Sequence, residues 1–89
     1  MFDYRKYTMK FKKNYMDAAL YGFDEVPDSY LTSALLELQE KYDFEIVSMK
    51  FNNCFNFSCI KIKCHKKDKQ KIFMEYCMSL KDLICNVSI

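Results

Sequence analysis

The segment FEIVSMKFNNCFNFSCIKIKCH, residues 44–65, decides the fold. Two runs rich in β-branched and aromatic residues flank a pair of asparagines, a pattern typical of a β-hairpin. With residues 52–54 as a three-residue loop, Val47 lies opposite Cys59 and Glu45 opposite Lys61. This register pairs apolar residues with apolar residues and one acidic residue with one basic residue. The sequence therefore favours it over a two-residue loop.

Both faces of this hairpin carry apolar residues, but at different ends. Near its open end one face holds Phe44, Ile46, Ile60 and Ile62. Near the turn the opposite face holds Val47, Met49, Phe51, Phe55 and Phe57. Since side chains alternate along a strand, we expect helices to cover the first face and to leave the second one open.

Two helices are predicted around the hairpin. The first opens at Pro27 with Asp28 or Ser29, and the second begins near Asp68, a plausible N-cap. Apolar residues recur at helical spacing in both. The stripes are Leu31, Ala34, Leu35, Leu38 and Tyr42 in the first, and Ile72, Phe73, Tyr76, Cys77, Leu80, Leu83 and Ile84 in the second. The closing residues NVSI can form a short final strand.

The amino-terminal part predicts a strand followed by a short helix. RKYTMKFK alternates, with Tyr7, Met9 and Phe11 on one side. NYMDAALYGF then fits a helix ending near Gly22, with the apolar stripe Met16, Ala19, Leu20 and Phe23. One continuous helix over residues 4–21 is the competing interpretation, because the aromatic residues also fit a 3.6-residue period.

The element order predicts an α+β fold over the single domain 1–89. Strand, helix, strand, strand, helix and optionally a last strand is the order of a small ferredoxin-like sandwich. In it the antiparallel hairpin 44–65 packs under two helices, which lie on one face of the sheet. The first strand and the second hairpin strand are then neighbours in the centre.

Composition and cysteine usage favour a small folded cytoplasmic protein. Of the 89 residues, 51% are hydrophobic and 17% aromatic, which argues against disorder. A single glycine excludes a glycine-rich phosphate loop. Five cysteines without regular spacing, and no apolar run of signal-peptide or membrane-span length, predict a reducing cytoplasm. The bias toward Phe, Tyr, Asn and Lys suggests A/T-rich coding, as in viruses, mobile elements and low-GC bacteria.

The net charge of +2 hides a segregation along the chain. Residues 1–13 and 61–71 are basic, whereas residues 17–45 are acidic. Such a distribution predicts a dipolar surface that can orient partners.

The cysteines and the one histidine do not predict a metal site or an active site. Cys59 and Cys64 lie on opposite faces of one strand, and the adjacent Cys64 and His65 diverge for the same reason. Structural zinc requires four converging ligands, and a Cys–His dyad requires a hydrogen bond between them. We therefore expect no enzyme, no metal and no cofactor.

The leading functional hypothesis is a protein-binding module, an adaptor or inhibitor plausibly from a virus or mobile element. Its predicted surface is the open sheet face with Met49, Phe51, Phe55 and Phe57, beside Lys6 and Lys10 and rimmed by Lys61 and Lys63. The partner would be another protein or a second copy of the chain. Alternatively, the segment around Met16 and Leu20 folds over this face and buries it.

The second hypothesis is nucleic-acid or phosphate binding through the lysine cluster 61–71. Lys66, Lys67, Lys69 and Lys71 surround the expected start of the last helix, where an anion would be stabilised by the helix dipole. Aromatic sheet faces flanked by lysine also bind single-stranded RNA.

Overall fold

The computed structural model describes residues 4–52 and 56–89 of the chain. Along the chain come β1 (Tyr4–Lys13), α1 (Tyr15–Ala18), the 3₁₀ turn η1 (Ala19–Tyr21), α2 (Asp28–Lys41), β2 (Phe44–Lys50), β3 (Ser58–His65), the 3₁₀ turn η2 (Lys66–Asp68), α3 (Lys69–Ser79) and β4 (Ile84–Ser88). The expected α+β class is confirmed.

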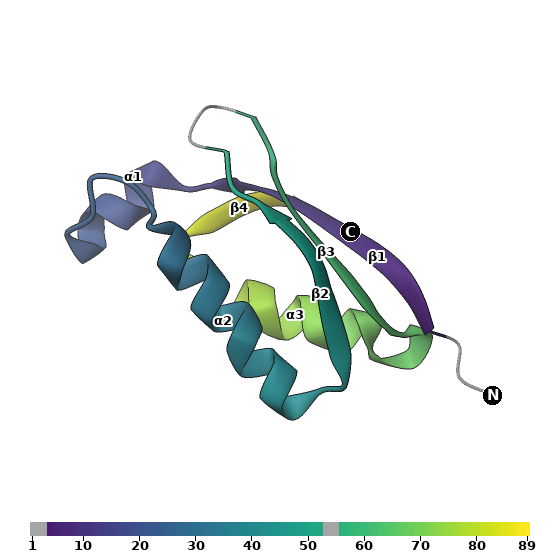
Figure 1. Ribbon diagram of the computed structural model, residues 1–89. Helices are drawn as coiled ribbons and strands as arrows, with labels where there is room; N and C mark the ends of the chain where they lie inside the picture. The colour runs from purple at the N-terminus through teal and green to yellow at the C-terminus, as the bar shows by residue number, and fades with distance from the viewer. Residues whose placement is uncertain (1–3, 53–55) are drawn as a thin grey trace.

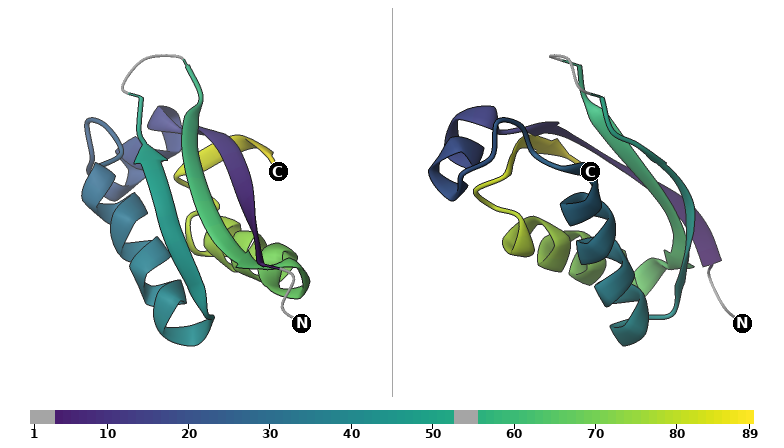
Figure 2. Two further views of the ribbon diagram at one scale, coloured as in Figure 1. Left: turned by 45° about the vertical axis from the view of Figure 1, so that its right-hand side comes forward. Right: turned by 60° about the vertical axis from the view of Figure 1, so that its left-hand side comes forward.

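The four strands form one sheet in the order β2-β3-β1-β4, with every neighbouring pair antiparallel. β1 and β3 are therefore the central strands, as the sequence predicts for the first strand and the second hairpin strand. Helices α2 and α3 both lie on one side of the sheet (Figure 1). Figure 2 shows the sheet curving around them, so that its uncovered side is the convex one.

Strand β1 follows the predicted two-residue alternation, and the continuous helix over residues 4–21 is wrong. Met9 and Phe11 are fully buried against the helices, and Tyr7 packs on the same core. Lys13 lies on this inner side as well, with only 1% of its side chain exposed and its Nζ 2.7 Å from Asp28 Oδ1. This ion pair ties the end of β1 to the start of α2.

The short helix after β1 exists, but its predicted apolar stripe is wrong. The Asn14 side chain accepts the Asp17 backbone N–H, and Gly22 ends η1 with a left-handed φ of 83°. Met16 is 86% exposed and Leu20 is 83% exposed, while Ala18 is buried. The α-helical part is a single turn that tightens into a 3₁₀ turn, so a 3.6-residue spacing does not hold across it. The exposed segment does not cover the open sheet face.

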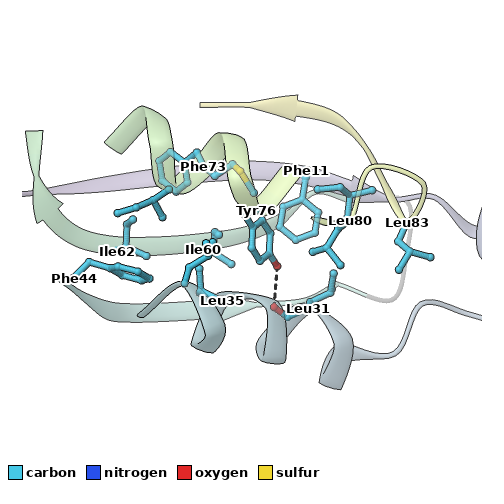
Figure 3. Packing of buried hydrophobic residues seen from close by; sticks show 14 of the residues in the cluster. Phe11, Leu31, Leu35, Phe44, Ile60, Ile62, Phe73, Tyr76, Leu80 and Leu83 are labelled. Carbon is cyan, nitrogen blue, oxygen red and sulfur yellow. Dashed lines mark hydrogen bonds between the residues drawn. The ribbon is translucent and has the colours of Figure 1, made fainter. Parts of the chain in front are cut away.

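The two long helices bury the predicted stripes. Leu31 and Leu35 of α2 and Phe73 and Tyr76 of α3 belong to one buried cluster, in which Tyr76 points toward Leu31 (Figure 3). Helix α3 is shorter than expected, because it ends at Ser79. Leu80, Leu83 and Ile84 remain buried, although they lie in the following turn and in β4. Asp68 occupies the N-cap position of α3, but its side chain makes no capping hydrogen bond.

The predicted register of the hairpin is wrong, although its two strands are correct. Cys59 lies opposite Lys50 instead of Val47, and Lys63 instead of Lys61 lies opposite Glu45. Strand β2 ends at Lys50 and β3 begins at Ser58, so the connection is longer than three residues. Part of the predicted turn lies outside the described residues. At its base the Asn52 backbone N–H donates to Ser58 Oγ at 3.0 Å.

The longer connection shifts the register of the whole hairpin, and a β-bulge at Val47 changes it once more within β2. The register shifts between Ile46, which pairs with Ile62, and Ser48, which pairs with Lys61. One extra residue in a strand moves all later side chains to the other face. Met49 therefore lies opposite Ile60 on the helix side.

Candidate functional site

The open side of the sheet is built by the alternation of β3 and β1. In β3 the residues Ser58, Ile60, Ile62 and Cys64 are buried toward the helices. The intervening residues point to the open side, where the pairing register sets each beside a residue of β1. These pairs are Cys59 with Lys10, Lys61 with Thr8, Lys63 with Lys6, and His65 with Tyr4.

Lysine dominates this open side. Lys12 lies opposite Cys85 of β4, and Lys50 lies opposite Cys59, so both join the same surface. We define the lysine face as Lys6, Lys10, Lys12, Lys50, Lys61 and Lys63. Glu45, opposite Lys63, is the acidic residue that the pairing places among them. None of the six lysines forms an ion pair with a carboxylate of residues 4–52 or 56–89.

The lysine face joins segments that are distant in the sequence. Residues 4–13 of the first basic segment form β1 and residues 61–65 of the second lie in the neighbouring β3, whereas acidic Glu37 and Glu40 lie on α2, across the core. Lysines from two distant parts of the chain thus gather on the open side of the sheet. The field of one cationic face attracts polyanions even though the net charge is small.

An aromatic residue lies at each end of the lysine face. At the end near β4, Lys12 Nζ lies 5.1 Å from the centroid of the Phe57 ring, and Phe57 is 38% exposed. At the other end the Tyr4 and His65 rings meet edge to face with centroids 4.4 Å apart. The Tyr4 hydroxyl donates to the Asp43 carbonyl oxygen at 3.2 Å, and His65 Nε2 lies 3.7 Å from Asp43 Oδ2.

The structure separates the residues of the predicted aromatic patch. Lys61 and Lys63 lie on the open side, and Phe57 is exposed at its end. Met49 and Phe51 do not belong to this side, because the bulge turns them toward the helices, where they pack on the core. Phe55 lies outside the described residues. The expected apolar surface is therefore a cationic one with one exposed phenylalanine.

The predicted anion-binding cluster is also divided. Lys66 and Lys67 lie in η2, and Lys69 and Lys71 lie in the first turn of α3, beyond the end of β3. Lys69 Nζ lies 4.9 Å from the centroid of the Tyr7 ring. These four lysines follow the strand that carries Lys61 and Lys63 and are not part of the lysine face.

Lys12 and Lys50 were absent from the predicted site, for different reasons. The alternation of RKYTMKFK already placed Lys12 with Lys6 and Lys10, so this residue could have been included from the sequence. Lys50 could be assigned to the open side only with knowledge of the bulge. Apolar residues fall at positions 44 and 46 and then at 47, 49 and 51, so the alternation changes phase between Ile46 and Val47, and this change was the available signal for the bulge.

Cys64 and Cys77 are the described thiols whose pKa is changed by burial. Burial raises the pKa of the Cys64 thiol and of the Cys77 thiol, so both are protonated and unreactive at neutral pH. No group of three or more His, Cys, Asp or Glu residues within the described part of the chain is placed to hold a metal ion. Among the same residues, no helix has the length and apolar character needed to cross a membrane.

A second surface feature lies at the far end of the molecule, around η1 and the turn after α3. A pocket of about 390 Å³ is lined there by Tyr21, Phe23, Tyr30 and Met78, together with residues 79–83. The Tyr21 hydroxyl donates to Asp82 Oδ2 at 2.8 Å, which joins η1 to the turn. We call this region, with the exposed Leu20 and Met16 beside it, the apolar end.

Comparison of the chain with protein families, with curated proteins and with solved structures finds no match.

Proposed function

We propose that the protein is a small non-enzymatic module that binds nucleic acid through its lysine face. The observation that carries the proposal is the concentration of six lysines, without ion-pair partners among the described carboxylates, on the one uncovered side of the sheet. Phosphate contacts by lysine supply most of the affinity of non-specific nucleic-acid binding.

The arrangement of these lysines is energetically unfavourable for the fold itself, which supports a binding role. Lys6 and Lys63 lie directly opposite each other on neighbouring strands. Like charges at such positions destabilise a sheet. A bound polyanion would neutralise both charges, so the cost to the free protein is offset in the complex.

Fluorescence anisotropy with labelled 20-nucleotide single-stranded and 20-base-pair duplex probes tests the proposal. We expect binding of at least one probe, with an affinity that falls steeply as salt increases. The double substitution Lys10→Gln with Lys61→Gln removes two phosphate contacts, so the slope of log K against log salt should become shallower by about 1.4 to 1.8.

A matched control has the same net charge but leaves the lysine face intact. In Lys66→Gln with Lys67→Gln two lysines at the start of α3 are neutralised, and binding should stay close to that of the parent protein. If this variant loses more affinity than the first, the site lies at the helix start. If neither probe binds the parent protein at low salt, the proposal is wrong.

We also propose that the fold is a ferredoxin-like sandwich. The support is the interleaving of two strand–helix–strand units, β1-α2-β2 and β3-α3-β4, in which the last strand of each lies next to the central strand of the other. An experimental structure, compared with known sandwiches, tests this classification.

Protein binding is the second candidate, and the apolar end favours it. Met16 and Leu20 are almost fully exposed beside a pocket lined by Tyr21 and Met78. Exposed methionine, leucine and tyrosine side chains grouped in this way are typical of the centre of an interface. The partner would be another protein or a second copy, at a surface other than the predicted aromatic patch.

Co-purification from host cells with nuclease treatment separates the two candidates. A partner protein held by the apolar end should survive the nuclease and should be lost from the variant Leu20→Lys. Self-association should appear as concentration-dependent sedimentation of the parent protein that Leu20→Lys abolishes. A Leu20→Lys variant that keeps every partner and the same sedimentation contradicts this candidate.

A further inference from the structure

The shape of the lysine face selects between the two forms of nucleic acid. The sheet bends around α2 and α3, so the lysine face is on the outside of the curve (Figure 2). The molecule measures 46 × 23 × 17 Å, whereas duplex DNA has a persistence length of about 500 Å. A stiff convex rod meets a convex surface along a narrow line, so few of the lysines could reach its phosphates together.

A single strand does not have this restriction, because it bends at every nucleotide. It can follow the curved surface along β1, where Tyr4 and Lys12 are eight residues apart, about 26 Å at 3.3 Å per residue. Lys6, Lys10 and Lys12 then line its path from one strand, and Lys61 and Lys63 line it from the next.

Phe57 supplies a contact that only an unpaired base can use. Its ring lies at the end of the lysine face, with Lys12 Nζ over it and the rest of its exposed surface toward solvent. Bases of a single strand stack on exposed aromatic rings, whereas those of a duplex are already stacked and paired. Lys12, held at the ring, is placed to neutralise the phosphate next to a stacked base.

The opposite end of the face is less suited to stacking. The Tyr4 ring is in contact with His65, and its hydroxyl donates a hydrogen bond to the Asp43 carbonyl oxygen. The carboxylates of Asp43 and Glu45 add negative charge there, which repels phosphate. The two ends of the face are therefore not equivalent, and the aromatic contact falls on Phe57.

We propose that the lysine face binds single-stranded nucleic acid and that one base stacks on Phe57. This inference rests on the proposed function, because it names the form of nucleic acid that the same surface takes. Single-stranded DNA binding should be at least about tenfold tighter than duplex binding, with a salt slope of up to about −4 if six phosphates are neutralised at 0.7 each.

Tryptophan fluorescence provides the direct test. The chain contains no tryptophan, so Phe57→Trp introduces a single reporter at the stacking position. Emission of this variant should be quenched by the oligonucleotide dT20, whereas inorganic polyphosphate, which has charge but no bases, should leave it unchanged. Tyr30→Trp on α2, away from the lysine face, is the control and should not be quenched by either probe.

Affinity measurements complete the test. Phe57→Leu should weaken dT20 binding by about 5- to 150-fold, the range for one stacked base, and should leave polyphosphate binding unchanged. The RNA oligonucleotide U20 is compared with dT20 in the same assays. Equal quenching or binding supports the inference for both RNA and DNA, and a difference shows which of the two nucleic acids the protein prefers. Should Phe57→Leu fail to fold, the fluorescence of Phe57→Trp decides.

Two results would overturn the inference while leaving the proposed function intact. One is a duplex that binds as tightly as dT20 while the lysine substitutions still weaken binding. The other is quenching of Phe57→Trp that is equal with polyphosphate and with dT20. If the parent protein binds no nucleic acid at all, the proposed function itself is refuted.

Discussion

Tyr76 shows how a single polar atom is accommodated in the core. The residue is fully buried, and its hydroxyl donates to the Leu31 carbonyl oxygen of α2 at 3.1 Å (Figure 3). Burial raises the pKa of this phenol far above its usual value, so the hydroxyl is protonated at neutral pH and can donate. The bond links the two helices that cover the sheet.

Removing only this hydroxyl tests its contribution. Tyr76→Phe should lower the free energy of unfolding by about 0.5–1.5 kcal/mol, the net value of one internal hydrogen bond. Urea denaturation followed by circular dichroism measures it. Tyr30→Phe is the matched control, because Tyr30 is half exposed and should change stability by less than about 0.5 kcal/mol. Equal effects of the two substitutions would show that the bond contributes nothing.

Asn86 is a second residue whose local chemistry is decisive. It has a positive φ of 52° in β4, at the point where the pairing between β1 and β4 changes register. Asparagine tolerates the left-handed region, while β-branched residues do not. Asn86→Val should therefore destabilise the protein by about 1–2 kcal/mol in thermal or urea unfolding. Asn86→Gly should be close to neutral, because glycine also tolerates a positive φ. An Asn86→Val variant as stable as the parent protein would show that the left-handed conformation at this position is not required.

At the scale of elements, Lys41 at the end of α2 links to Glu75 in the middle of α3. Lys41 Nζ donates to Glu75 Oε1 at 2.5 Å. This hydrogen bond holds the pKa of Glu75 below its usual value. A carboxyl whose folded-state pKa is depressed adds stability above its unfolded pKa and loses it as the pH falls.

This linkage predicts a pH dependence with a definite sign. The stability difference between the parent protein and Lys41→Met should be largest near pH 7 and should shrink below about pH 4.5, where the unfolded chain takes up the proton. Urea midpoints measured from pH 3 to pH 7 provide the check. Lys41 is exposed and Glu75 is partly exposed, so the difference should be small and should also decrease with added salt. A difference that grows toward low pH would contradict the assignment.

The elements also show how far a sequence pattern can be followed. The two-residue alternation of β1 and the leucine stripe of α2 predicted their buried faces correctly, because each periodicity belongs to one regular element. In β2 the predicted alternation failed at Val47, where the bulge breaks the period, and the predicted register was wrong along the whole strand because the connection to β3 is longer than three residues. Helix α3 was predicted too long for a related reason, since Leu80 and Leu83 stay buried after the helix has ended.

At the scale of the whole molecule, the lysines that we expect to bind nucleic acid also lower the stability of the fold, because they repel each other. Lys6 lies directly opposite Lys63, and Lys6→Glu would convert a repulsive pair into an attractive one. We expect this substitution to raise the free energy of unfolding by about 0.2–1 kcal/mol and to weaken nucleic-acid binding. Lys6→Gln should give a smaller change of the same sign in each measurement.

Denaturation and anisotropy at two salt concentrations measure both effects. The stability gain should shrink at high salt, because screening weakens the repulsion that the substitution removes. A Lys6→Glu variant that is less stable than the parent protein, or that binds nucleic acid equally well, would remove the energetic argument for the lysine face.

The amino-acid sequence alone determined the α+β class, the strands and helices, and the alternation that separates Lys6, Lys10 and Lys12 from Met9 and Phe11. These properties depend on neighbours in the chain, which periodicity reports. Only the tertiary structure decided the register of β2 against β3, and that the bulge turns Met49 and Phe51 inward. Strand pairing and bulges depend on which distant residues complete the core. The predicted aromatic surface thus became a cationic one, because Met49 and Phe51 pack against the core and the lysines stay on the open side.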